Sequence, residues 1–442
     1  MDMSIDALQR VYRSGEATPG DIARYVLSRL DAADQHAVWI STASEDRILD
    51  RAAELERAVD RMDELPLYGV PFSVKDNIDV AGEMTTAACP AFAYRAECSA
   101  TVVERALAAG AIYIGKTNLD QFATGLVGVR SPYGIPRNPF NSDYIPGGSS
   151  SGAAVSISTG VVSFAFGTDT GGSGRIPASY NGIYGFKPAP GDWSRAGLVY
   201  ACRSFDTPSV FTACLGDALA VDAVVRGVDA QDPFSKDIER VNVAEPRIAM
   251  VSPVDAETFG DADVETLYAS AHDTMSEIFP ELGRADLKAF QVVNDLMFFG
   301  PFLAERDVSV GEFIDAHRDE SHPVVGSLIQ SSRKFSAADA YRAQYQVAET
   351  IRDTARFWEE FDVLVTPTVG ALVTLKACEE DPLGPNFRNG TYTNFANPLG
   401  LAAISVPFGR TVAGVPWGLT LYALPERLPS LTTVAKQLAC TR

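Results

Sequence analysis

The feature that most constrains this 442-residue chain is a pair of glycine- and serine-rich segments, at 147–152 (GGSSSG) and 168–175 (TDTGGSGR). Glycine permits tight turns, and serine supplies a hydroxyl that can be activated as a nucleophile. The first segment runs into the largely apolar stretch 153–157, which predicts a sharp turn entering an ordered element rather than a flexible linker. The second follows the β-rich run 161–166, which predicts a turn after a buried strand.

A lysine lies upstream of both segments in an apolar stretch, as Lys75 within GVPFSVKDN. A serine hydroxyl needs a base to take its proton, and burial can lower the pKa of a lysine until its neutral amine does so. In the alternative interpretation the lysine stem packs at a strand end and the ammonium stays in water. No histidine lies in or beside the two segments; the four are His36, His272, His317 and His322. The three segments together predict a serine hydrolase with a lysine base.

Composition bounds the class of protein. The hydrophobic fraction of 46% supports a large core, and the net charge of −20 opposes binding to nucleic acid or to an anionic membrane. No apolar run reaches the roughly 18 residues of a membrane span, and the N-terminus lacks an export pattern, so we expect a cytoplasmic protein. The six cysteines show no CxxC pair and no metal-ligand spacing, which predicts reduced thiols.

The N-terminal segment, about 1–60, is predicted to be helical. Thr18 and Pro19 are typical of a helix cap followed by proline at the first helical position, and Ile22, Val26 and Leu30 then recur every four residues. This spacing places one apolar stripe toward the core.

Short β-rich runs alternate with helical stretches and glycine turns over 67–227, which predicts a layered α/β core. The region of about 255–361 is largely helical in pattern, with a long segment after Ser336, and a buried strand resumes at Val363. We interpret 255–361 as a helical insertion that covers the sheet. No linker marks a secure boundary, so 1–442 is expected to form a single domain.

The stretch 110–117 fits the GxxxxGK[ST] pattern of a phosphate-binding loop. The centre of such a loop must turn its N–H groups toward phosphate, whereas Ala-Ile-Tyr-Ile is apolar and β-prone. We therefore predict a strand here, and a nucleotide-binding protein is the less favoured alternative, which stabilisation by ATP would reveal.

Charged residues flank the second glycine turn. Asp169 and Arg175 are predicted to form an ion pair that braces it, with a structural rather than a chemical role. The small residues of the turn allow consecutive backbone N–H groups to point at one spot as an oxyanion hole, although an ordinary glycine turn is the alternative.

Lys75 and the segments 147–152 and 168–175 resemble the amidase signature family, and their spacing agrees with it. The resemblance implies an α/β fold with a large mixed central sheet covered by helices on both faces. It also implies that no metal or organic cofactor takes part.

By that resemblance Ser173 is the nucleophile. Ser149, next to a cis peptide, would relay its proton, and Lys75 would be the ultimate base. The oxyanion is expected to bind the amide groups of Thr170, Gly171, Gly172 and Ser173.

Within the family the chain is most similar to the allophanate hydrolases, which hydrolyse N-carboxyurea. The resemblance covers nearly the whole chain, and its more specific stretches are 38–41, 121–128, 201–204, 300–306 and 390–395. It implies that Arg306 binds the substrate carboxylate, for which a guanidinium fork is suited. Gly125 and the residue at position 298 are expected to line the substrate site.

The sequence departs from the subgroup in three ways, of which the first two leave the substrate open. Phe298 stands where a tyrosine is usual, Gly400 stands where an acidic residue is expected, and the sequence is expected to lack the extra C-terminal domain that many members of the subgroup have. An amidase or carbamate hydrolase with a less polar substrate is therefore an alternative.

The sequence thus predicts hydrolysis of a small amide or urea-like molecule, with allophanate as first choice and a homodimer as a possible assembly. Part of a tRNA-dependent amidotransferase is another alternative, because the ammonia-producing subunits of those enzymes share the signature. The charge of −20 argues against RNA contact unless a second chain supplies it.

Overall fold

The computed structural model describes residues 1–31 and 37–440, so His36 lies outside the described residues. The strands are β1 Trp39–Thr42, β2 Pro71–Lys75, β3 Met84–Thr85, β4 Tyr94–Arg95, β5 Ile112–Thr117, β6 Phe164–Asp169, β7 Tyr184–Lys187, β8 Thr207–Thr212, β9 Ile248–Val251, β10 Gly283–Ala285, β11 Val363–Pro367, β12 Ala402–Arg410 and β13 Pro416–Ala423. The α-helices are α1 Ile5–Ser14, α2 Pro19–Asp31, α3 Glu45–Arg57, α4 Thr101–Ala108, α5 Ser151–Ser158, α6 Ile176–Asn181, α7 Leu215–Val225, α8 Ala262–Ile278, α9 Lys288–Gln291, α10 Leu303–Ala316, α11 Pro323–Ser331, α12 Ala337–Glu360, α13 Leu375–Glu380, α14 Gly384–Gly390 and α15 Leu428–Ala439.

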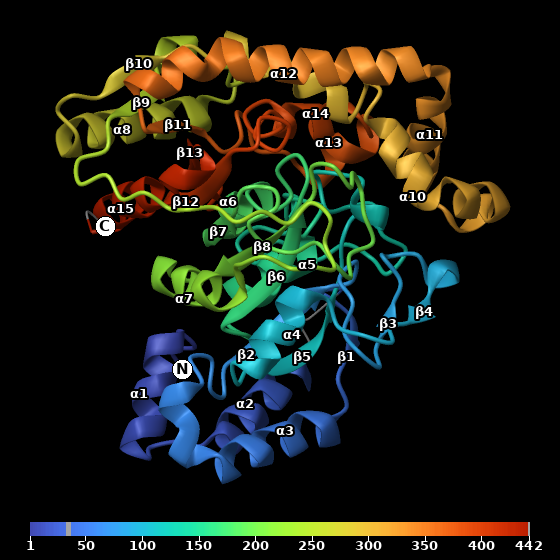
Figure 1. The fold of residues 1–442 in the computed structure, drawn as a ribbon, viewed down its shortest axis with the longest axis vertical. Coiled ribbons are helices and arrows are strands. Elements are labelled where there is room, and N and C mark those ends of the chain that lie inside the picture. The colour runs from blue at the N-terminus through green and yellow to red at the C-terminus, as the bar shows by residue number, and fades with distance from the viewer. Residues whose placement is uncertain (32–36, 441–442) are drawn as a thin grey trace.

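A mixed sheet organises the molecule (Figure 1). Among the described residues it has eleven strands in the order β1-β5-β2-β6-β8-β7-β12-β13-β11-β9-β10. β2 runs parallel to β5 and β6, β9 runs parallel to β10 and β11, and the remaining neighbours are antiparallel. Every residue of β2, β5, β6, β8 and β13 is buried, as strands covered on both faces require. The predicted mixed sheet with both faces covered is confirmed.

The predicted helix start at Pro19 is confirmed. The backbone N–H of Thr18 donates to the Asp21 carboxylate at 2.9 Å, and the Asp21 N–H donates to the Thr18 hydroxyl at 3.2 Å. Ile22 and Val26 are fully buried. The N-terminal segment also contains β1, which pairs with β5 at the edge of the main sheet, so it is not helical throughout.

Within the stretch 110–117, residues Ile112–Thr117 form β5, so the predicted strand is confirmed. Lys116 is completely buried and its Nζ lies 3.0 Å from Asp76 Oδ1, in a buried ion pair. Residues 112–117 are extended as a β-strand and so do not form the loop that binds phosphate in nucleotide-binding proteins.

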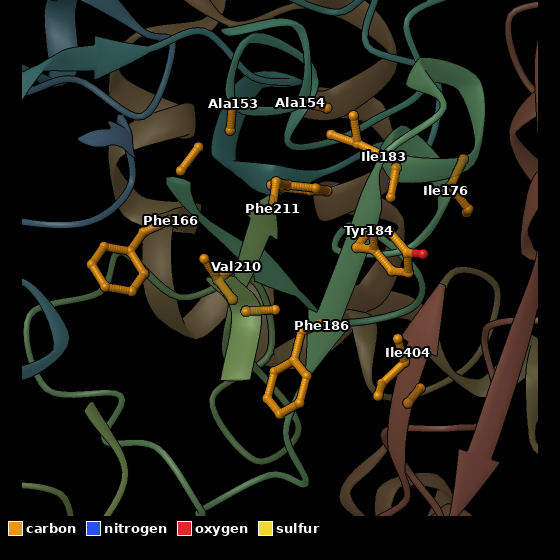
Figure 2. Packing of buried hydrophobic residues seen from close by; sticks show 14 of the residues in the cluster. Ala153, Ala154, Phe166, Ile176, Ile183, Tyr184, Phe186, Val210, Phe211 and Ile404 are labelled. Carbon is orange, nitrogen blue, oxygen red and sulfur yellow. The ribbon is translucent and has the colours of Figure 1, made fainter. Parts of the chain in front are cut away.

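Aromatic side chains fill the core on β2 and β6. The Phe72 and Phe164 rings stack at 4.9 Å between centroids. Small residues let α5 approach the sheet closely, and Figure 2 shows Ala153 and Ala154 of this helix together with Phe211 of β8. This close packing brings the serine-rich segment before α5 near the ends of β2 and β6.

The region 255–361 contains α8 to α12 as expected, and α12 begins after Ser336 with a capping box to Asp339. α12 crosses one end of the molecule, opposite α1, α2 and α3 (Figure 1). The same region also supplies β10, which pairs with β9, so it extends the sheet in addition to flanking it. That the whole chain forms one domain stays a prediction. In the described part of the chain, no helix combines the length and apolarity needed to cross a membrane.

Candidate active site

The candidate site lies where β2 and β6 end. Lys75 is the last residue of β2 and Asp169 the last of β6, and these neighbouring strands are parallel. Parallel strands bring their carboxyl ends to one edge of a sheet, which is where ligands bind in many α/β proteins. The serine-rich segment joins this edge from α5, since Ser150 Oγ donates to the Thr168 carbonyl at 3.1 Å.

Lys75 is fully buried, which excludes the alternative of an ammonium group in water. Its Nζ lies 2.8 Å from Ser149 Oγ and 2.7 Å from Thr168 Oγ1. Burial lowers the pKa of Lys75 to about 7, although nearby carboxylates, of which Asp120 has the largest effect, act in the opposite direction. A substantial fraction of Lys75 is therefore neutral near pH 7. The Gly148–Ser149 peptide is cis, as the family resemblance implies.

Ser173 lies in the loop between β6 and α6 and is 2% exposed. Its hydroxyl makes no hydrogen bond with Ser149 or with any other described residue. The structure thus joins Lys75 directly to Ser149, while the link from Ser149 to Ser173 stays a prediction. None of the three described histidines hydrogen-bonds to either serine.

The loop that carries Ser173 is built around a buried carboxylate. Asp169 accepts hydrogen bonds from the amides of Gly172 and Gly174, each at 2.9 Å. Arg175 donates to both Asp169 oxygens, through Nε and Nη2, each at 2.9 Å. Burial alone would raise the pKa of Asp169, but Arg175, Lys187 and the Gly174 amide hold it below its usual value. The predicted ion pair is confirmed and braces the loop.

The backbone amides of the loop divide into two sets. The Gly172 N–H is directed at Asp169, at a φ of +136° that favours glycine, so in this geometry it does not face a substrate as expected. The amides of Thr170, Gly171 and Ser173 are buried and donate to no acceptor within the described residues. Buried N–H groups without partners are costly, so these three amides form a candidate site for a negatively charged oxygen.

Arg306 and Phe298 lie beside this loop. Arg306 is 1% exposed, and only its Nη1 is paired, donating to the Met297 carbonyl at 3.1 Å. Its Nε and Nη2 have no partner in the described part of the chain, which suits a planar anion such as a carboxylate. The guanidinium lies 5.1 Å from the centre of the Phe298 ring, and a Cβ on Gly171 would lie 3.1 Å from the same ring. Phe298 therefore lies between Arg306 and the loop of Ser173.

Gly125 is required by packing. A Cβ at this position would lie 2.4 Å from the Asp120 carboxylate, which accepts hydrogen bonds from the amides of Gly128 and Arg130, each at 2.9 Å. The Asp120 N–H in turn donates to the Ser149 carbonyl at 3.0 Å. Contact between Gly125 and a substrate stays a prediction.

Sequence reasoning missed Asp120, Thr168, Asp206 and Asn394. Asp206 accepts a hydrogen bond from the Thr170 hydroxyl, and Asn394 Oδ1 is unpaired within the described residues, 2.9 Å from where a Gly171 Cβ would lie. A cavity of about 250 Å³ borders Asn394 and is also lined by Asn294, Phe299 and Phe387 among others. Thr168 lies within the segment 168–175 and Asn394 within 390–395, whereas no local pattern marks Asp206.

A family model for amidases matches residues 21–427. The chain belongs to the amidase family, and is therefore an amidohydrolase by class.

Three known proteins are similar to this chain over most of its length. The urea amidolyase of Saccharomyces cerevisiae is 38% identical over 379 residues, which cover 84% of this chain but only 20% of that much longer protein. A glutamyl-tRNA(Gln) amidotransferase subunit from Symbiobacterium thermophilum is 33% identical over 92% of this chain and 90% of its own length. A structure of Kluyveromyces lactis allophanate hydrolase superposes with a TM-score of 0.93 at 34% identity, over 98% of this chain and 72% of that one.

Replacing Arg175 by leucine should destabilise the protein by about 3–5 kcal/mol, because it leaves the Asp169 carboxylate buried without its charge partner. Urea unfolding followed by circular dichroism measures the change. Arg342→Ala is the matched control: Arg342 pairs with Asp339 on the surface, so its loss should change the free energy of unfolding by no more than about 0.5 kcal/mol. A stable Arg175→Leu protein would contradict the bracing role.

Proposed function

We propose that this protein hydrolyses a small amide or urea-like substrate through an acyl-enzyme at Ser173, with allophanate as the first choice. The observation that carries the proposal is a buried lysine of low pKa in contact with Ser149, beside a loop that combines a serine with unpaired amides. A lysine in its neutral form can activate a serine as histidine does in other hydrolases.

In the proposed reaction Ser173 Oγ attacks the carbonyl carbon of the substrate. The Ser173 proton passes to Ser149, and the Ser149 proton passes to neutral Lys75. The carbonyl oxygen becomes negative and accepts hydrogen bonds from the amides of Thr170, Gly171 and Ser173. The carbon–nitrogen bond then breaks, and the proton held at Lys75 returns through Ser149 to the leaving nitrogen, which departs as ammonia. Water hydrolyses the ester by the same relay and releases the acid.

The carboxylate of allophanate would bind the two unpaired donors of Arg306. An ion that enters this buried site leaves water, so it needs a fixed partner, and the bidentate fork supplies one. The similarity to Kluyveromyces lactis allophanate hydrolase supports the same choice of substrate. Hydrolysis of the terminal amide would yield one ammonia and a dicarboxylate.

Two alternative functions have specific support. Phe298 offers no hydrogen bond to a substrate beside Arg306, which favours a less polar amide or carbamate. Gly400 is the second departure from the subgroup. Its φ is +69°, so an acidic residue there would have a strained backbone, although its Cβ would meet nothing within 4 Å. Similarity to an amidotransferase component supports a role in an ammonia-producing complex, although the net charge of −20 would then require a partner chain for RNA contact.

The test is an ammonia-release assay on purified protein with allophanate, biuret, malonamate and simple carbamates. We expect the highest kcat/KM for allophanate, and near-complete loss in Ser173→Ala with an unchanged thermal midpoint, because the acyl-enzyme cannot form. Preference for a carbamate would select the alternative substrate. Wild-type turnover by folded Ser173→Ala would exclude the mechanism.

The pH dependence tests the proton relay. Lys75 must be neutral to accept a proton, so kcat/KM should rise with pH, fall tenfold per unit well below pH 7, and have its acid-side midpoint near the pKa of about 7. Lys75→Ala should lose nearly all activity. A flat profile between pH 5.5 and 8 on a stable substrate would count against Lys75 as the base.

Phe298→Tyr tests the polarity of the substrate site. If allophanate is the substrate, the new hydroxyl can hydrogen-bond to it, and a gain of ~1.4 kcal/mol corresponds to roughly tenfold in kcat/KM. If a less polar amide is the substrate, activity on that amide should fall because the hydroxyl stays unpaired. Kinetics of the wild type and of Phe298→Tyr on both substrates separate the two cases. If kcat/KM changes on no substrate, position 298 does not line the substrate site.

A further inference from the structure

The orientation of the Thr170 amide is fixed from two sides. A peptide group is planar, so the Thr170 N–H points opposite to the carbonyl of Asp169. That carbonyl accepts a hydrogen bond from Asn397 Nδ2 at 2.7 Å. On the other side of the peptide, the Thr170 side-chain hydroxyl donates to the Asp206 carboxylate. Both bonds are buried, so water does not compete for them.

The turn at 201–206 that carries Asp206 is itself rigid. Asp206 Oδ2 accepts from the amides of Ala201 at 2.8 Å and Cys202 at 3.1 Å, and the Asp206 N–H donates to the Cys202 carbonyl at 2.8 Å. Asn397 Nδ2 also donates to the Phe205 carbonyl, at 2.9 Å. The turn and the Asp169–Thr170 peptide are therefore held together by two independent side chains.

The amide of Ser173 is oriented in a different way. The carbonyl of its peptide group belongs to Gly172 and accepts from the backbone N–H groups of Arg175 at 2.9 Å and Ile176 at 2.8 Å. The first turn of α6 thus fixes the Ser173 amide with backbone bonds alone. The Thr170 end of the loop has no such helix and depends on side chains.

We propose that Asp206, acting through the Thr170 hydroxyl, is a positioning residue that aims the Thr170 amide at the oxygen of the substrate. The inference rests on the proposed function, in which that amide binds the developing oxyanion. Oxyanion donors act only within about 2.7–3.1 Å of the oxygen, so a peptide free to rotate would lose this contact in the transition state more than in the ground state.

The experiment compares Thr170→Val, which has nearly the same shape but no hydroxyl, with Thr170→Ser, which keeps the hydroxyl. We expect Thr170→Val to lower kcat by about 10- to 100-fold with KM within about threefold, and Thr170→Ser to stay within about threefold of wild type in both. Thr101→Val is the control, because it removes another threonine–aspartate bond, to Asp229, that lies outside the candidate site. Asp206→Asn is measured in parallel, so the test does not depend on the folding of one variant.

A binding readout separates positioning from general damage. The ligand 3-boronopropanoate can form a tetrahedral adduct with a serine, whereas malonate occupies the carboxylate site without an adduct. Thr170→Val and Asp206→Asn should weaken the boronate by about 10-fold or more and leave malonate affinity within about twofold. Equal weakening of both ligands, wild-type kcat in folded Thr170→Val, or Thr170→Ser as slow as Thr170→Val would each overturn the proposal. Failure of the proposed function would give a different result. The wild-type protein would then form no boronate adduct at Ser173, so Ser173→Ala would not change boronate binding.

Discussion

The buried pair of Asp169 and Arg175 is the interaction on which the candidate site depends. The carboxylate gathers two loop amides, and the guanidinium extends the contact to the Thr393 carbonyl at 3.1 Å and to the Tyr422 hydroxyl at 3.3 Å. One ion pair therefore connects the end of β6, the loop of Ser173, the 390–394 segment and β13. Neither charge is exposed, so loss of any of these hydrogen bonds would leave a buried charge without a partner, and the pair stabilises the loop in the conformation that satisfies it.

Charge around Lys75 is balanced rather than neutralised. Burial favours the neutral amine, while Asp120, Asp206 and Asp169 favour the ammonium without forming an ion pair with it. A direct carboxylate partner would stabilise the ammonium and leave it a poor base. Each of the three carboxylates is instead hydrogen-bonded to groups other than Lys75, which keeps their charges at a distance.

Local pattern was sufficient to predict the helix start at Pro19, the strand in place of a phosphate loop at 110–117, and the pair of Asp169 and Arg175. Each of these three features depends on residues that lie close together in the sequence. The supports of the site were not predictable in this way, because Asp206 and Asn397 reach the loop from segments distant in sequence and carry no motif of their own. The hydrogen bond from the Gly172 amide to Asp169 was also not predicted. The spacing of glycines shows that a turn is possible, but not which N–H groups of the turn donate to Asp169.

The two hydrogen bonds of Lys75 have a consequence for the direction of its contact with Ser149. A neutral amine has two hydrogens and one lone pair, so it can donate to Thr168 and still accept from Ser149. An ammonium has three hydrogens and no lone pair, so it donates to both hydroxyls, and its hydrogen bond with Ser149 then runs in the opposite direction. In either state one N–H is left without a partner within the described residues, so the same two contacts fit the amine and the ammonium, and a change of protonation at Lys75 requires no new partner.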